Sequence, residues 1–288
     1  MSFALHRPST IAEAVALAGK YGSAARLVAG GTDLVIQINR KRLAPEHLID
    51  LSGLPDLAGI EEDASGFVLG ALTTHKTIEQ HPAFQGELRA LVEAARVIGG
   101  HQIRNVATVG GNIVNASPAA DLVPVLLVLD AEVALAGAAD TRHLPLERFL
   151  TGPNRTERRL DEVLTEVRFR KLPPRSATAF LKAGRRRAME ISVVCVAARL
   201  TLDAERRCRQ VRLSLGAVGP KALRPEAAEQ YLEGQPAAPE RFREAGRIAA
   251  EGSAPISDVR ASDRYRRLLA GALVGRALQA SLDRIDAR

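Results

Sequence analysis

The sequence contains no tryptophan, and Phe, Trp and Tyr together make up only 3% of its 288 residues. Proteins that bind single-stranded nucleic acid usually stack bases on aromatic side chains, so this composition argues against that function. Hydrophobic residues nevertheless make up 46% of the chain. The core must therefore be built mainly from Ala, Leu, Val and Ile.

Cysteine is also scarce, since the only two are Cys195 and Cys208. An iron–sulfur cluster normally takes four thiolates, and two cysteines make a poor disulfide framework. None of the six histidines has His-x-x-x-His spacing. We therefore expect no metal site held by this chain.

Long apolar runs are missing as well. No run approaches the roughly 20 residues that a membrane-spanning helix needs, and the N-terminus has no charged lead followed by an apolar core, as a signal peptide would. We expect a cytoplasmic protein without a transmembrane segment. The formal net charge is +7, and residues 151–188 alone carry an excess of that size. Such a segment suits contact with phosphates or an acidic partner.

Two adjacent glycines, Gly110 and Gly111, stand in the most informative stretch, Thr108 to Asp121. Glycine lets the backbone approach a ligand closely, and free N–H groups near the start of a helix attract phosphate oxygens. Asp121 stands at a good N-cap position for the apolar run that follows it. An ordinary tight turn before a helix is the alternative interpretation.

The same pattern occurs earlier, at Ala29-Gly-Gly-Thr-Asp33. Two glycine corners, each between apolar segments, suit an extended ligand with several phosphates, such as a dinucleotide with a diphosphate. Neither corner has the G-x-G-x-x-G or the G-x-x-x-x-G-K-[ST] spacing, so the usual Rossmann and P-loop geometries are not expected.

Hydrophobic periodicity predicts a small β-α-β unit near the N-terminus. A helix over 11–18, with Thr10 and Glu13 as a capping box, precedes a strand over 26–29, a helix over 33–41 and a strand over 47–51. The first glycine corner lies where the strand leads into the helix, which is a usual place for a ligand.

Alternating strand and helix patterns continue after this unit. Strands are expected over 57–60, 66–71, 132–136 and 162–169, and helices over 76–80, 84–98 and 121–129. Pro173-Pro174 indicates a domain boundary. Beyond it, strands over 178–182, 199–203 and 211–218 precede helices over 225–232, 239–251 and 262–285. Strands followed by helices are typical of an α+β domain.

Four motifs together resemble a known family, the FAD-binding medium subunits of molybdenum hydroxylases, the group of xanthine dehydrogenase and carbon monoxide dehydrogenase. They are LVAGGTDL at 27–34, IRNVATVGGN at 103–112, ASPAAD at 116–121 and FLKAGRRR at 180–187. The resemblance covers nearly the whole chain. It implies an α+β fold in which residues 1–172 form an FAD-binding domain of the vanillyl-alcohol-oxidase type, with lobes of about 1–55 and 56–172. Residues 175–288 would form a smaller α+β domain of the carbon monoxide dehydrogenase flavoprotein type.

The resemblance also implies which residues hold FAD. The two glycine corners would bind the diphosphate, Asp121 would bind ribityl or ribose hydroxyls, Ile98 and Leu164 would be apolar walls, and Lys182 would be a polar contact from the C-terminal domain. The corner residues are Leu27, Val28, Ala29, Gly30, Gly31, Thr32, Asp33, Leu34, Thr108, Val109, Gly110, Gly111 and Asn112. No catalytic acid or base is expected.

The function implied is that of an electron-transfer flavoprotein subunit. Its partners would be a [2Fe–2S] small subunit and a large subunit with the molybdenum cofactor, and an external acceptor such as NAD⁺, oxygen or a quinone would take the electrons. A heterotrimer is expected. A stand-alone FAD-dependent reductase of the same superfold and a non-catalytic nucleotide-binding scaffold subunit are the alternatives.

Several polar residues keep more than one interpretation. Asp33 either caps its helix or contacts the cofactor. His75 and His101 could tether a flavin covalently, although loop histidines are more often only hydrogen-bonded. Arg185-Arg186-Arg187 is either a solvated run or a contact with phosphate or a partner.

Overall fold

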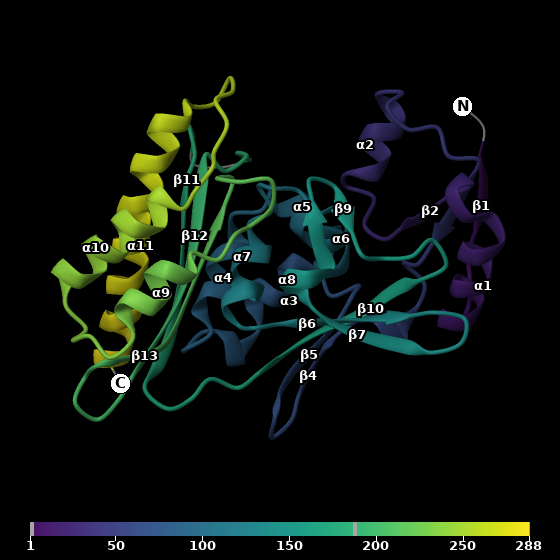
Figure 1. Cartoon of the computed structure of the whole chain (residues 1–288). Coiled ribbons are helices and arrows are strands. Elements are labelled where there is room, and N and C mark those ends of the chain that lie inside the picture. Colours follow the sequence, from purple (N-terminus) through teal and green to yellow (C-terminus); the bar gives the residue numbers. More distant parts are fainter. Residues whose placement is uncertain (1–2, 187–188, 288) are drawn as a thin grey trace.

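The computed structural model describes residues 3–186 and 189–287, and the chain forms three parts side by side (Figure 1). The N-terminal lobe holds a parallel three-stranded sheet in the order β1-β3-β2. Its elements are β1 (Ala4–His6), α1 (Ile11–Tyr21), β2 (Ala25–Val28), α2 (Leu34–Asn39) and β3 (His47–Asp50), with a 3₁₀ turn at Gly22–Ala24. The predicted β-α-β unit is confirmed.

Helix α1 begins where its capping residues place it. The Thr10 side chain accepts a hydrogen bond from the Glu13 N–H, and the Glu13 carboxylate accepts one from the Ser9 N–H. These bonds satisfy donors that the first turn would otherwise leave free. The apolar face of α1 then lies on the small core of this lobe, with Ala14, Val15 and Ala18 buried.

The second lobe is built on a five-stranded antiparallel sheet in the order β4-β5-β10-β6-β7. The strands are β4 (Ile60–Glu62), β5 (Gly66–Gly70), β6 (Glu132–Ala136), β7 (Thr141–Pro145) and β10 (Val163–Arg170), with a small pair β8 (Leu150–Gly152) and β9 (Arg155–Thr156). The helices are α3 (His75–Gln80), α4 (Arg89–Arg96), α5 (His101–Val106), α6 (Val109–Asn115), α7 (Leu122–Val128) and α8 (Leu146–Phe149).

Two predictions for this lobe were wrong at their boundaries. The helix expected over 84–98 begins only at Arg89, because Gly86 interrupts the pattern and the preceding Pro82–Phe84 forms a 3₁₀ turn. Phe84 is instead fixed in the core against Phe67, with ring centroids 5.2 Å apart. The strand expected over 57–60 begins at Ile60, since Pro55–Leu57 is also a 3₁₀ turn.

The C-terminal domain is an antiparallel sheet covered on one face by helices (Figure 1). Its strands are β11 (Ser176–Ala183), β12 (Val194–Leu202) and β13 (Cys208–Gly216), in that order, and its helices are α9 (Glu226–Leu232), α10 (Pro239–Glu251) and α11 (Asp263–Asp286). The strands followed by helices confirm the expected α+β class. Strand β12 begins five residues before the strand predicted over 199–203, and it is buried along its whole length.

The cores show which parts are joined most closely. Phe180, Cys195 and Ala197 of the C-terminal sheet belong to the same hydrophobic cluster as α4 and α7 of the second lobe. The N-terminal lobe has a separate, smaller cluster that reaches Ala136 and Val163. Pro173-Pro174 lies between β10 and β11, and the division into domains there remains a prediction. Within the described residues no helix is both long and apolar enough to cross a membrane.

Candidate functional site

The first glycine corner connects β2 to α2, and its two glycines are needed for different reasons. Gly31 has φ +67°, a conformation that L residues with side chains rarely adopt. Gly30 lies so close to the end of α5 that an added Cβ would stand 1.9 Å from the Val106 carbonyl oxygen. The backbones of the two segments therefore touch, with no room for a side chain between them.

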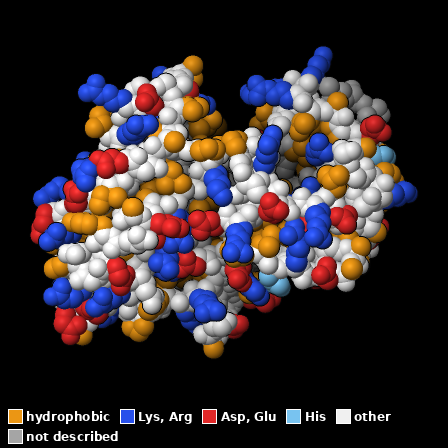
Figure 2. All heavy atoms as spheres, viewed as in Figure 1, with side chains coloured by type: hydrophobic (Ala, Val, Ile, Leu, Met, Phe, Trp, Pro, Cys, Tyr) orange, Lys and Arg blue, Asp and Glu red, His pale blue; other side chains and the backbone are white. Residues whose placement is uncertain are grey.

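This contact brings the two glycine corners together. Val106 ends α5 only two residues before Thr108, which begins the second corner. The corners therefore lie at the junction of the two lobes, where one extended ligand could contact both. Figure 2 shows a notch at the top of the view, between the upper end of the C-terminal domain on the left and the part of the N-terminal lobe that carries α2 in Figure 1 on the right.

The second glycine corner differs from the turn that the sequence predicted. Gly110 and Gly111 lie in the first turn of a separate short helix, α6, and the Thr108 hydroxyl caps it by accepting a 3.1 Å hydrogen bond from the Gly111 N–H. The N–H groups of Val109 and Gly110 donate to the carbonyls of Thr73 and Ala71, both at 2.9 Å. These two donors are consequently not free for a ligand.

Gly110 is required by packing within the protein. An added Cβ would lie 2.7 Å from the Ala71 carbonyl oxygen, whereas at Gly111 the nearest atom in range is the Thr108 hydroxyl at 3.1 Å. Gly111 is exposed. Only the second glycine of this corner thus faces outward.

Polar and apolar groups at the corners fit a dinucleotide. The Asn112 Oδ1 atom is buried and has no hydrogen-bond partner within the described chain, and such an atom needs one. Val35, Ile36 and Val106 are between 44% and 49% exposed. The remaining corner residues, Leu27, Val28, Ala29, Thr32 and Leu34, are half-buried, and Asp33 is exposed.

Asp121 does not cap α7 with its side chain, as its position had suggested. Its carboxylate accepts hydrogen bonds from Lys182 Nζ at 2.6 Å and from Ser192 Oγ at 2.5 Å. Burial raises the pKa of Asp121, and Lys182 opposes that shift. Asp121 and Lys182 therefore join the second lobe to the C-terminal domain, and their predicted contacts with a cofactor remain predictions.

The other predicted wall residues lie in different surroundings. Ile98 is partly buried and packs against the large core, and the Arg104 guanidinium donates to its carbonyl at 3.4 Å. Leu164 is 4% exposed, inside that core on β10. The side chain of Leu164 is therefore surrounded by protein atoms, and its role as a cofactor wall remains a prediction.

The histidines and Asp33 also have definite positions. His75 is 1% exposed, and burial together with the nearby Arg104 lowers its pKa to about 4, so it is neutral at pH 7. His101 is exposed at the start of α5. The Asp33 side chain does not cap α2; it accepts a 2.5 Å hydrogen bond from Gln37 Nε2.

The basic run after β11 is partly described. Arg185 donates to the Val259 carbonyl at 3.2 Å, Arg186 pairs with Glu190 at 3.1 Å, and Arg187 lies outside the described residues.

Sequence reasoning missed Val106, Ser192 and Glu190 as parts of the site. Val106 stands inside the quoted 103–112 motif, but only the close approach of Gly30 shows its importance.

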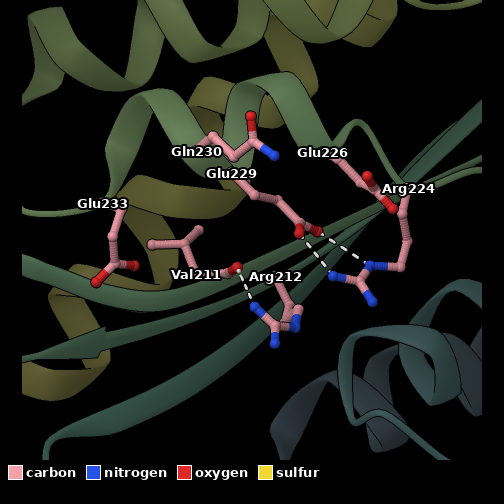
Figure 3. Close-up of a pocket in the computed structure, with 7 residues that line it drawn as sticks. All are labelled: Val211, Arg212, Arg224, Glu226, Glu229, Gln230 and Glu233. Carbon is pink, nitrogen blue, oxygen red and sulfur yellow. Dashed lines mark hydrogen bonds and ion pairs between the residues drawn. The ribbon is translucent and has the colours of Figure 1, made fainter.

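A surface cavity of about 290 Å³ lies elsewhere, between β13 and α9 of the C-terminal domain (Figure 3). Arg224 and Glu229 form a bidentate ion pair there, and the shorter of its two hydrogen bonds is 2.6 Å. The glutamates and arginines lining this cavity largely neutralise one another, so it does not compete with the glycine corners as a cofactor site.

Comparison with known proteins identifies the family. Residues 1–171 match the model of the FAD-binding domain in molybdopterin dehydrogenase, and residues 178–281 match that of the carbon monoxide dehydrogenase flavoprotein C-terminal domain. The chain belongs to the family of FAD-binding subunits of molybdopterin dehydrogenases. Its cofactor is FAD, and it is a flavoprotein subunit of a multi-subunit oxidoreductase of the xanthine dehydrogenase family.

Individual relatives align over most of their length. The chain is 33% identical over 279 residues to the carbon monoxide dehydrogenase medium chain of Hydrogenophaga pseudoflava, which covers 97% of this chain and 96% of that one. It is 35% identical over 238 residues to the nicotinate dehydrogenase FAD-subunit of Eubacterium barkeri, covering 81% and 80%. A carbon monoxide dehydrogenase structure from H. pseudoflava superposes with a TM-score of 0.95 at 33% identity, covering 99% and 98%. The predicted fold class is confirmed.

Proposed function

We propose that the two glycine corners hold the FAD diphosphate and that the chain passes electrons from [2Fe–2S] clusters of a partner subunit to an external acceptor. The observation that carries this proposal is the contact of Gly30 with Val106, which places both corners at one junction. FAD can exchange electrons in steps of one or two, and the protein binds and orients it.

On this proposal, the two corners contact the ligand in different ways. At the first corner the backbone from Ala29 to Asp33 turns between β2 and α2, and α2 begins beside it. At the second corner the N–H groups of Val109 and Gly110 donate within the protein and that of Gly111 donates to the Thr108 hydroxyl. The exposed surface of Gly111 and the unpaired Asn112 Oδ1, which would accept from a ligand hydroxyl, remain for the ligand. The half-exposed apolar residues nearby would exclude water from the cofactor. Ile98, Asp121, Leu164 and Lys182 remain weaker candidates for contact with FAD.

The partners and setting follow from the same proposal. We expect a [2Fe–2S] small subunit and a molybdopterin-binding large subunit in a cytoplasmic heterotrimer. The described residues hold no group of three or more His, Cys, Asp or Glu that could bind a metal ion. On this proposal, substrate oxidation at molybdenum takes place on the large subunit.

Co-expression with the genes adjacent to this one tests the proposal. The purified complex is expected to contain FAD, iron and molybdenum, and the flavin absorbance should bleach when the reducing substrate is added without air. A colourless complex whose denatured supernatant holds no flavin would refute the assignment of the site. A yellow protein that purifies alone and turns over a substrate by itself would instead indicate a stand-alone reductase.

A further inference from the structure

Four large apolar side chains are exposed close together in the C-terminal domain. Ile256 and Val259, in the loop that joins α10 to α11, are 71% and 88% exposed. Tyr265 and Leu268, near the start of α11, are 53% and 65% exposed. The loop projects from the upper end of this domain in Figure 1. Single exposed apolar residues are common on protein surfaces, but a group of them marks a surface that another molecule covers.

Hydrogen bonds fold this loop onto the first turn of α11. The Asp258 carboxylate accepts from the N–H groups of Arg260 and Ala261 at 2.8 and 3.2 Å. The Asp258 N–H in turn donates to the Ala261 carbonyl at 3.0 Å. Ser257 and Asp263 exchange two further bonds of 2.8 and 2.9 Å. The loop therefore closes on itself, and its apolar side chains lie beside those of α11.

Arg266 fixes the loop to the rest of the domain. This residue of α11 is 3% exposed, and its guanidinium donates to the Asp258 carboxylate at 2.7 Å. It also donates to the carbonyls of Val193 and Ala217, at 2.6 and 3.2 Å. A surface that is rigid before binding loses little conformational freedom on association. The loop is thus pre-organised for contact with another molecule.

The charges around the apolar side chains indicate what kind of molecule covers them. Arg264 and Arg267 are exposed on the same turns of α11, and neither guanidinium lies within ion-pair distance of a carboxylate among the described residues. The acidic residues of this segment, Asp258 and Asp263, already accept the hydrogen bonds of the loop. Carboxylates on a partner would therefore be complementary to this surface. Tyrosine and arginine are also side-chain types that are enriched at protein interfaces.

We propose that this surface docks a patch of another subunit of the same oxidoreductase, a patch with apolar side chains at its centre and carboxylates at its edge. The chain is a flavoprotein subunit of a multi-subunit enzyme, so such a partner exists. The inference does not depend on where FAD binds. We call the surface the α11 surface, and it consists of Ile256, Val259, Arg264, Tyr265, Arg267 and Leu268.

Two other occupants fit the α11 surface less well. Anionic lipid is usually bound by clusters of about four to eight Lys or Arg, whereas the described segment 256–268 offers only Arg264 and Arg267 unpaired, because Arg260 pairs with Asp258 at 3.0 Å and Arg266 is buried. A second copy of this chain would bring the same patch to both sides of a two-fold interface. The free arginines would then face each other, and like charges repel.

Site-specific cross-linking in the co-expressed complex identifies the partner. Val259→Cys introduces the only exposed thiol, since Cys195 and Cys208 are both buried. A benzophenone maleimide attached there is expected to capture a peptide of another subunit that contains Asp or Glu beside apolar residues. Leu160→Cys is the matched control, because Leu160 is 54% exposed in another part of the chain. Capture of a second copy, capture of no protein, or capture of the same peptide from both positions would overturn the inference.

Charge reversal measures the strength of the contact. Arg264→Glu/Arg267→Glu should raise the dissociation constant of the chain from the complex at least tenfold, the equivalent of about 1.4 kcal/mol, and reduce its dependence on salt. Arg243→Glu/Arg276→Glu is the matched control, since these arginines are exposed elsewhere on α10 and α11. Circular dichroism of each full-length chain establishes that both double variants fold.

Equal dissociation constants and salt dependence in the two double variants would overturn the inference. So would binding of the full chain to phosphatidylserine vesicles that Arg264→Glu/Arg267→Glu abolishes, because the α11 surface would then contact lipid. A complex that assembles normally but holds no FAD would refute the proposed function and leave this inference standing.

Discussion

The two glycine corners share one sequence pattern, yet the structure uses them in opposite ways. At the first corner the leading glycine, Gly30, touches the backbone of the other lobe, and Gly31 supplies the left-handed turn. At the second corner Gly110 packs inside its own lobe against Ala71, and Gly111 faces outward. A repeated motif therefore need not repeat its physical role, and substitution by alanine at each glycine separates packing from ligand access.

Gly30→Ala should have the largest effect. The new Cβ would stand 1.9 Å from the Val106 carbonyl oxygen, which is a backbone atom of the other lobe, so one of the two backbones would have to shift. We expect a loss of about 3 kcal/mol in the free energy of unfolding, the upper range for overpacking, together with loss of FAD. Urea unfolding and equilibrium dialysis measure the two effects. Gly53→Ala is the control, because no atom lies within 4 Å of its added Cβ; equal stability of the two variants would contradict the close contact between the lobes.

Gly110→Ala should come next. The Cβ would lie 2.7 Å from both the Ala71 Cβ and its carbonyl oxygen. Overpacking of this kind typically costs about 1–3 kcal/mol, partly offset by the better helix propensity of alanine. Gly275→Ala in α11 is a suitable comparison, since its nearest contact is an ordinary 3.4 Å. Thermal unfolding should show a lower midpoint for Gly110→Ala than for Gly275→Ala, and the reverse order would show that Ala71 yields.

Thr108→Ala removes the cap of α6 and should have a moderate effect. The hydroxyl accepts from the Gly111 N–H, and loss of an N-cap usually costs about 1 kcal/mol. Thr10→Ala removes the equivalent bond from α1 in the other lobe. Both variants should lose similar stability in urea. Only Thr108→Ala should weaken FAD binding, because it leaves the first turn of α6, which belongs to the proposed site, without its cap. Equal FAD affinity in the two would show that the second corner does not depend on its cap.

Sequence patterns predicted most of this architecture because local signals decided it. Thr10 and Glu13 fixed the start of α1, and Pro239 marked the start of α10 where it was expected. The site was less predictable, since its decisive contacts join distant segments. Nothing local to Gly110 shows that Ala71 accepts its N–H, and nothing local to Asp121 shows that Lys182 and Ser192 occupy its carboxylate. Helix α6 was not predicted, because two glycines lower the helix propensity of this stretch. The Thr108 cap and the hydrogen bonds to Ala71 and Thr73 stabilise the helix in spite of them.

Gly111→Ala should have the smallest effect on stability and the most informative effect on binding. The added Cβ meets only the Thr108 hydroxyl at 3.1 Å, and alanine is the better helix former by up to about 1 kcal/mol. The free energy of unfolding should therefore stay unchanged or rise slightly. FAD affinity should nevertheless fall, because the methyl group would occupy the outward face along which the diphosphate approaches the α6 N-terminus. Isothermal titration of the apoprotein with FAD, beside urea unfolding of the same samples, measures both quantities. Unchanged affinity would leave the first corner as the sole diphosphate contact, and the repeated motif at the second would then serve only to pack α6 against β5.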